Sequence, residues 1–199
     1  MARLAIILSS IIGLTLLVTI ILIACSLAVL NYNEVGLNYS NWFKTVEMKT
    51  YEKGIHFIGL GHVFQKYEIS LTNIEFSSDK GATLPLIRCR TKDGLEVDLE
   101  ISLQYTVDPK KIYDIYTTFG TSEKPILYRV VLDAVSDIAT QYTSSDFFQK
   151  RAEIQIMMQT EVQTQVNQQT FHIVKFFQLR SLNLPDPFED EIKNTEVKG

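Results

Sequence analysis

The sequence predicts an α+β protein that begins with a transmembrane helix. The first observation is an apolar stretch without charge from Leu4 to Leu30. The second is strict alternation of apolar and polar residues from Leu95 to Val107, which is typical of a strand with one buried face. The third is a change to helical spacing directly after that strand. A hairpin that leads straight into an amphipathic helix indicates an α+β domain of antiparallel strands and amphipathic helices.

The apolar stretch is long enough to cross a membrane. A helix over residues 4–30 extends roughly 40 Å, against a hydrocarbon core of about 30 Å. Cleavage as a signal peptide and lipidation at Cys25 are the alternatives, but the apolar run continues to Leu30, which favours an uncleaved anchor. Arg3 precedes the span and Glu34 follows it, so the positive-inside rule places the following domain on the side opposite the N-terminus.

Aromatic residues follow the span. Tyr32, Tyr39 and Trp42 belong to the residue types that settle at membrane interfaces, and the alternative is that they simply begin the first sheet. The glycines of segment 51–64 indicate turns between short strands, because a nucleotide-binding loop requires a third glycine and a following helix. Residues 66–76 are predicted to form one strand.

A hairpin is predicted at the centre of the chain. Residues 86–91 are expected to pair with the strand 95–107, through a two-residue type I′ turn at Asp93-Gly94. The apolar positions of the long strand then face the core. Its acidic positions form an outer row that is available to a neighbouring strand, a subunit or solvent. These positions are Glu96, Asp98 and Glu100.

Helices are predicted after the long strand. Asp108 is expected to cap the first helix and Gly120 to end it. The second covers residues 121–142, and the third runs from a capping cluster at 144–146 to about residue 169. The second half of the third helix is rich in Gln and Thr and poor in charge. Its face is therefore expected to meet other subunits, and a plain compositional bias toward Gln is the alternative.

The C-terminal part returns to extended character. Residues 171–184 are predicted to form a strand that Pro185 ends, and residues 188–192 are predicted to open one more helix.

Composition and motifs argue against several functions. The net charge of −4, with no basic run longer than two residues, argues against nucleic acid as a partner. Two cysteines do not make a disulfide framework. His56, His62 and His172 lack the spacing of a closed metal site, and no phosphate-binding or nucleophile motif is present. The sequence therefore predicts no enzyme, no cofactor, and no catalytic, cofactor-binding or metal-binding residue.

The order of these motifs resembles the SPFH (band 7) superfamily of stomatins, prohibitins, flotillins and their bacterial relatives. The resemblance covers roughly residues 32–192. The segments that carry it are GIHFIGLGHVF (54–64), TKDGLEVDLEISLQYTVDP (91–109), IYTTFG (115–120), SSDFFQKR (144–151) and VKFFQLRSLNLPDPF (174–188).

This resemblance implies an SPFH-type domain beside the bilayer that has no catalytic role. The expected partners are the lipid bilayer and an SPFH homo- or hetero-oligomer or the subunits of another membrane complex. The apolar segment contains no proline, so a single span of the prohibitin type fits better than a kinked stomatin hairpin. The expected organisation is an anchor over residues 1–30, the SPFH domain over 31–192, and a tail over 193–199 without the long coiled coil usual in the family.

Three functions are weighed on this basis. The first is a membrane-anchored scaffold that assembles with itself or with other membrane proteins. The second is an accessory structural subunit of a large inner-membrane complex, respiratory or transport. The third, a membrane-tethered enzyme, has only scattered Asp, Glu and His in its favour. The prohibitin-like order favours the mitochondrial inner membrane, with the domain on the intermembrane-space side, and the plasma membrane or an endomembrane is the alternative.

Overall fold

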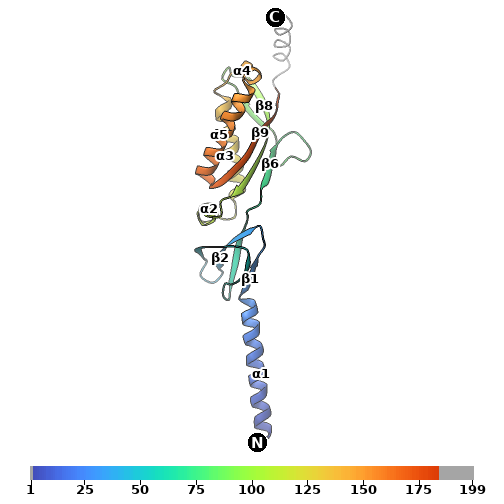
Figure 1. Cartoon of the computed structure of the whole chain (residues 1–199), viewed down its shortest axis with the longest axis vertical. Helices are drawn as coiled ribbons and strands as arrows, with labels where there is room; N and C mark the ends of the chain where they lie inside the picture. The colour runs from blue at the N-terminus through green and yellow to red at the C-terminus, as the bar shows by residue number, and fades with distance from the viewer. Residues whose placement is uncertain (1, 184–199) are drawn as a thin grey trace, which may run out of the picture. The chain divides into compact units, whose positions relative to one another are not determined.

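The computed structural model describes residues 2–183 and divides the chain into two compact units, residues 1–69 and 70–199 (Figure 1). The first unit contains one helix and five strands. They are α1 (Ala2–Cys25), β1 (Leu27–Leu30), β2 (Glu34–Ser40), β3 (Thr45–Tyr51), β4 (Gly54–Phe57) and β5 (His62–Glu68).

The helix α1 ends before the apolar stretch does. Its backbone turns at Ser26, whose N–H donates to the carbonyl of Ile23, and residues 27–30 continue as the strand β1. The prediction of one helix from 4 to 30 is therefore wrong for its last five residues. A strand of uncharged residues with one apolar face has the same composition as a membrane helix, so apolar content alone does not mark the boundary.

Two small antiparallel sheets form the rest of the first unit. Strand β1 pairs with β4, and β2 lies between β3 and β5. Turns at Gly59 and Gly61, both with positive φ, join β4 to β5 and confirm the predicted role of the glycines. The strand predicted over 66–76 is two strands, because β5 ends at Glu68 and the chain begins β6 at Thr72.

The second unit is one antiparallel sheet covered by helices (Figure 1). The long strand β8 is central: β6 and β7 pair along one of its edges and β9 along the other. The elements are β6 (Thr72–Phe76), β7 (Ile87–Arg90), β8 (Glu96–Val107), α2 (Ile112–Phe119), α3 (Glu123–Ala139), α4 (Ser144–Gln149), α5 (Arg151–Thr170) and β9 (His172–Asn183).

The core of this unit lies between the sheet and the helices α3 and α5. Every second side chain of β8 from Val97 to Val107 is buried, as the alternation predicts. The helix α5 places a stripe of buried side chains, spaced four residues apart, in the same core. The stripe consists of Ile154, Met158, Val162 and Val166.

The turn before β8 differs from the prediction. Thr91 donates its backbone N–H to the carbonyl of Leu95, so three residues close the turn, and of these only Gly94 has a positive φ. A type I′ turn requires positive φ at Asp93 as well, which is absent. The predicted two-residue turn is therefore wrong, and the hairpin itself, β7 with β8, is confirmed.

Two helix starts also differ. Asp108 accepts the N–H of Lys110 in a local turn, and α2 begins only at Ile112, so Asp108 is not its cap. Gly120 ends α2 as predicted, in a positive-φ conformation. The predicted third helix is two helices, because the backbone breaks at Lys150 between α4 and α5.

The cap of α4 is Thr143, one residue earlier than the predicted cluster. Its hydroxyl accepts the N–H of Asp146, and the Asp146 carboxylate accepts the N–H of Thr143. The same carboxylate pairs with Lys150 at 2.9 Å. The Lys150 ammonium and the Thr143 donors lower the pKa of Asp146 to about 2. The predictions at Pro185, at residues 188–192 and for the tail lie outside the described residues.

Candidate interaction surfaces

The histidines and cysteines lie apart in different environments. His56 bonds the carbonyl of Glu52 and His62 bonds the side chain of Asn38, so the two make no common site. Cys89 is buried, and this burial together with the nearby Asp98 carboxylate raises the pKa of its thiol to about 12. Among residues 2–183, no group of His, Cys, Asp and Glu side chains has the arrangement of a metal site.

His172 is buried at the junction of α5 and β9. Its Nδ1 lies 2.7 Å from the carbonyl oxygen of Thr170, and its ring packs edge-on against Tyr105 at 5.5 Å between centroids. Burial lowers the pKa of the imidazole, and this outweighs the hydrogen bond with Thr170 and the charge of Glu123, which raise it. The neutral ring is therefore part of the core.

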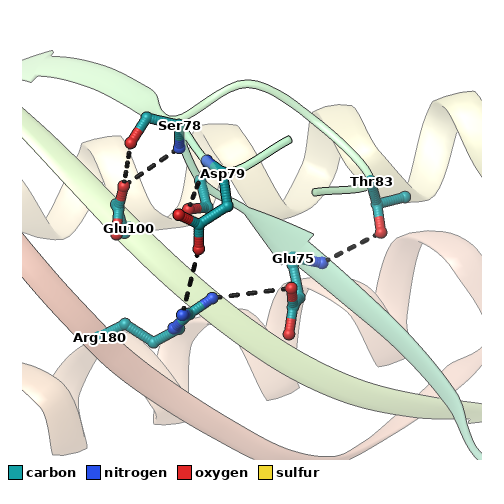
Figure 2. A network of polar contacts seen from close by, with 7 residues as sticks. Glu75, Ser78, Asp79, Thr83, Glu100 and Arg180 are labelled. Atoms are coloured by element: carbon teal, nitrogen blue, oxygen red, sulfur yellow. Dashed lines mark hydrogen bonds and ion pairs between the residues drawn. The ribbon is translucent and has the colours of Figure 1, made fainter. Parts of the chain in front are cut away.

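The outer row of β8 is largely occupied by its neighbours in the sheet. Glu100 accepts the backbone N–H of Ser78 at 3.1 Å and its hydroxyl at 2.7 Å (Figure 2). These bonds, the backbone one first, lower the pKa of Glu100. Asp98 faces the guanidinium of Arg88 on β7 at 3.3 Å. Of the three alternatives for this acidic row, Asp98 and Glu100 contact a neighbouring strand or loop.

Arg180 crosses the outer face of the sheet from β9. It lies at a break in the register between β9 and β8, where a bulge re-aims the side chain. Its guanidinium reaches the carboxylates of Glu75 on β6 at 3.6 Å and Asp79 in the following loop at 3.4 Å (Figure 2). The loop after β6 is thus held by Glu100 of β8 and by Arg180 of β9.

The outward face of α5 carries almost no charge. From residue 154 to 170, Glu161 is the one charged side chain. Ile156 and Met157 are exposed near the start of this face, and Thr160 and Thr164 follow with hydroxyls that donate to their own helix backbone. A partner could cover this face and desolvate almost no charge, which is consistent with the predicted contact between subunits.

The strand β9 forms one edge of the sheet. Among the described residues it pairs with β8 alone, so its second edge is open. A shallow groove of about 420 Å³ lies where the end of α5 meets the start of β9. Uncharged residues line the groove: Gln163, Thr164, Asn167, Gln168, Ile173 and Val174. An open edge beside a groove is the arrangement that accepts an added strand.

The three aromatic residues after the span occupy different positions. Tyr39 lies within β2, which agrees with a start of the sheet. Tyr32 lies in the turn between β1 and β2, where the ammonium of Lys53 stands 3.9 Å from its ring centroid. Trp42 lies at the tip of the hairpin between β2 and β3 and is exposed. Tyr39 is therefore part of the first sheet, and for Tyr32 and Trp42 a place at the membrane interface stays a prediction.

One helix of the described chain, α1 over Ile7–Cys25, is long and apolar enough to cross a membrane, and its side chains are exposed throughout. A comparison with curated proteins finds no match. The model of the SPFH domain / Band 7 family matches residues 28–198, which is most of the chain. Members of this family are generally membrane-associated scaffolds without enzymatic activity. The chain belongs to the SPFH/Band 7 family.

Proposed function

We propose that this chain is a non-catalytic, membrane-anchored SPFH scaffold that assembles with copies of itself or with other membrane proteins. The observation that carries the proposal is the family match over residues 28–198 directly after a helix with the length and composition of a span. The anchor comprises residues 1–30, with its helical part ending at Cys25, the domain residues 31–192, and the tail 193–199. No catalytic, cofactor-binding or metal-binding residue is assigned.

The outward face of α5 is the proposed assembly surface. The pair Thr160 and Thr164 lies at its centre, one helical turn apart, and both side chains are exposed. A partner that covers this face buries Ile156, and the one charge that it would meet between residues 154 and 170 is Glu161.

The test is the particle size of the full chain in mild detergent. We expect a complex larger than a monomer, and expect Thr160→Lys with Thr164→Lys to reduce its size, because two ammonium groups would be buried without partners. The matched control is Ser136→Lys with Thr140→Lys, two residues with the same spacing at the end of α3 and at its C-cap, whose hydroxyls also donate to carbonyls of the preceding turn. A monodisperse monomer with no co-purifying partner would contradict the proposal. A complex that survives the α5 variant would exclude only this face.

The membrane is proposed from the order of the chain. One span followed by the domain is similar to prohibitins and favours the mitochondrial inner membrane, with the domain in the intermembrane space, because Arg3 precedes the span and Glu34 follows it. Organelle fractionation followed by protease protection tests both points. Recovery in plasma membrane or endomembrane fractions would exclude the mitochondrial assignment. Membership of a larger respiratory or transport complex would be seen as unrelated subunits in the same particle.

A further inference from the structure

The ribbon formed by β1 and β4 has one apolar face that nothing in its own unit covers. Leu27 pairs with Phe57 and Val29 pairs with Ile55, so the four side chains lie on the same side of the ribbon. Their exposed fractions are 47%, 67%, 53% and 71%, respectively. The opposite face of the ribbon carries Leu30, which is buried.

A second exposed apolar group lies at the tip of the β2–β3 hairpin. Trp42 is 73% exposed and Phe43 is 77% exposed. The tip is held in shape by backbone bonds: Asn41 donates to the carbonyl of Gly61 at 2.9 Å, and Lys44 donates to the carbonyl of Ser40 at 2.9 Å. Two aromatic side chains are thus fixed in an outward position, which is unfavourable in water.

Gly61 is required for this arrangement. The indole of Trp42 lies directly over it, so a Cβ built on Gly61 would come within 2.0 Å of the indole Nε1. The φ of Gly61 is +73°, which any other residue adopts at a cost. The backbone of the β4–β5 turn therefore supports the indole from below and leaves its other face open.

Both groups lie on the side of the two small sheets that faces the C-terminal end of α1. Ile58, directly after Phe57, donates its N–H to the carbonyl of Ser26, the residue that follows the helix, at 2.9 Å. The turn from Ile58 to Gly61 then leads to the hairpin tip. At about 3.3 Å per residue, Leu27 lies roughly 7 Å beyond the end of the helix, within the headgroup layer of about 5–8 Å.

We propose that these six residues, the apolar rim, are a second membrane contact beside the span: Leu27, Val29, Trp42, Phe43, Ile55 and Phe57. The rim rests in the interfacial layer of the bilayer, with the β1–β4 ribbon oblique to its plane so that both cross-strand pairs touch lipid. Trp at a headgroup layer has its ring in an apolar setting and its N–H in a wet one. Lys44, exposed next to Phe43, is placed to meet lipid phosphates. The proposal rests on the membrane anchor proposed above.

The bilayer is the occupant that the distribution of charge favours. The apolar rim begins at the first residues after the span and ends at the charged turn Glu52-Lys53, at the far end of the ribbon. A contact with a second copy of the chain would not require the surface to change from apolar near the span to charged at the far end of the ribbon. Continuity with the span also means that the lipid surface is already adjacent to the rim, so contact costs no further association entropy.

The experiment uses the fact that Trp42 is the single tryptophan of the chain. The full chain is reconstituted in phosphatidylcholine vesicles, with and without brominated acyl chains, and flotation confirms insertion. We expect Trp42 emission to be blue-shifted, protected from aqueous iodide, and about twofold weaker in brominated vesicles, because an interfacial indole meets the lipid bromines. Two variants in a Trp42→Phe background extend the test. Phe57→Trp should be quenched in the same way, and Tyr32→Trp, at the opposite end of β1, should not.

Each other outcome contradicts the proposal in a distinguishable way. A chain that floats with the vesicles but has red-shifted, iodide-accessible Trp42 keeps its anchor and has no second contact. Trp42 protected from iodide but unaffected by bromine is covered by protein, which overturns the bilayer in favour of a second copy. A chain that does not float overturns the anchor and the rim together. The particle size in detergent tests the proposed assembly only. It does not affect how the flotation and fluorescence results are interpreted.

Discussion

The carboxylate of Asp93 accepts two hydrogen bonds from Ser144, 51 residues later in the chain: Oδ2 lies 2.6 Å from the hydroxyl and Oδ1 lies 3.2 Å from the backbone nitrogen. Asp93 belongs to the turn before β8, and Ser144 is the buried first residue of α4. The Thr91 hydroxyl donates to the same carboxylate, and Lys92 donates its N–H to the carbonyl of Tyr142. The turn of the hairpin is therefore fastened to the helical layer.

Asp93→Ala is expected to lower the free energy of unfolding by about 1–3 kcal/mol, because it leaves the buried N–H and hydroxyl of Ser144 without their acceptor. Chemical denaturation monitored by circular dichroism measures the change. Asp133→Ala, an exposed aspartate on α3, is the control and should change the free energy by less than about 0.5 kcal/mol. An equal decrease in the free energy of unfolding in the two variants would mean that the contact between Asp93 and Ser144 does not stabilise the fold.

Glu100→Ala should release the loop that follows β6. The variant loses both bonds from Ser78, and with partial exposure we expect a loss of about 0.5–1 kcal/mol. Hydrogen exchange should accelerate at the Ser78 amide first. Glu96→Ala removes an exposed carboxylate from the same outer row and should leave that amide unchanged. If Ser78 exchanges at its original rate in Glu100→Ala, another group holds the loop.

His172 should make the stability of the domain depend on pH. Its pKa in the folded state is below the ordinary value of 6.5, so the unfolded chain binds the proton more readily. Stability is therefore complete above pH 6.5 and falls as the pH decreases from there toward the folded pKa, by at most about 1.4 kcal/mol per pH unit.

His172→Asn should flatten this dependence below pH 6.5, although lost packing will also lower stability at every pH. The control is His56→Asn, the same substitution in the first unit, away from the core of the second. Urea denaturation at a series of pH values between about 5 and 8 compares the three proteins, on either side of the ordinary His pKa. If the stability of His172→Asn depends on pH as steeply as that of the wild-type protein, a group other than His172 takes up the proton on unfolding.

Leu99→Asp should prevent folding of the second unit, because Leu99 is completely buried in the middle of β8 and the carboxylate would lie among the apolar side chains of the core. Loss of the cooperative transition in calorimetry is the expected result. Gln104→Asp places the same charge on the outer row of the same strand and should fold. A folded Leu99→Asp protein would contradict the position of the core.

The sequence predicts those parts of the fold in which one strong periodicity decides the structure. The alternation in β8 and the helical spacing in α3 each leave one arrangement that buries the apolar side chains, and both are confirmed. Where two structures bury the same residues equally well, the sequence does not choose. Residues 27–30 suit a membrane helix or a strand, and their pairing with β4 depends on residues 54–57, far along the chain.

The side-chain contacts that hold the loop after β6 in the second unit could not be predicted from periodicity. Arg180 is one of several exposed basic residues in the sequence, and its role follows from a bulge that turns its side chain toward Glu75 and Asp79. The apolar rim is a partial exception. Trp42 was an evident candidate for an interface, but only the position of its hairpin beside the end of α1 separates it from Tyr32 and Tyr39.

The guanidinium of Arg151 has a consequence for any strand that joins the open edge of β9. It donates to the carbonyl oxygens of Leu179 at 3.2 Å and Arg180 at 2.8 Å, so these acceptors are already occupied. A strand that added to β9 from His172 onward would compete with Arg151 for these acceptors when it reached Leu179. The first residue of α5 therefore shields this part of the edge from a further strand.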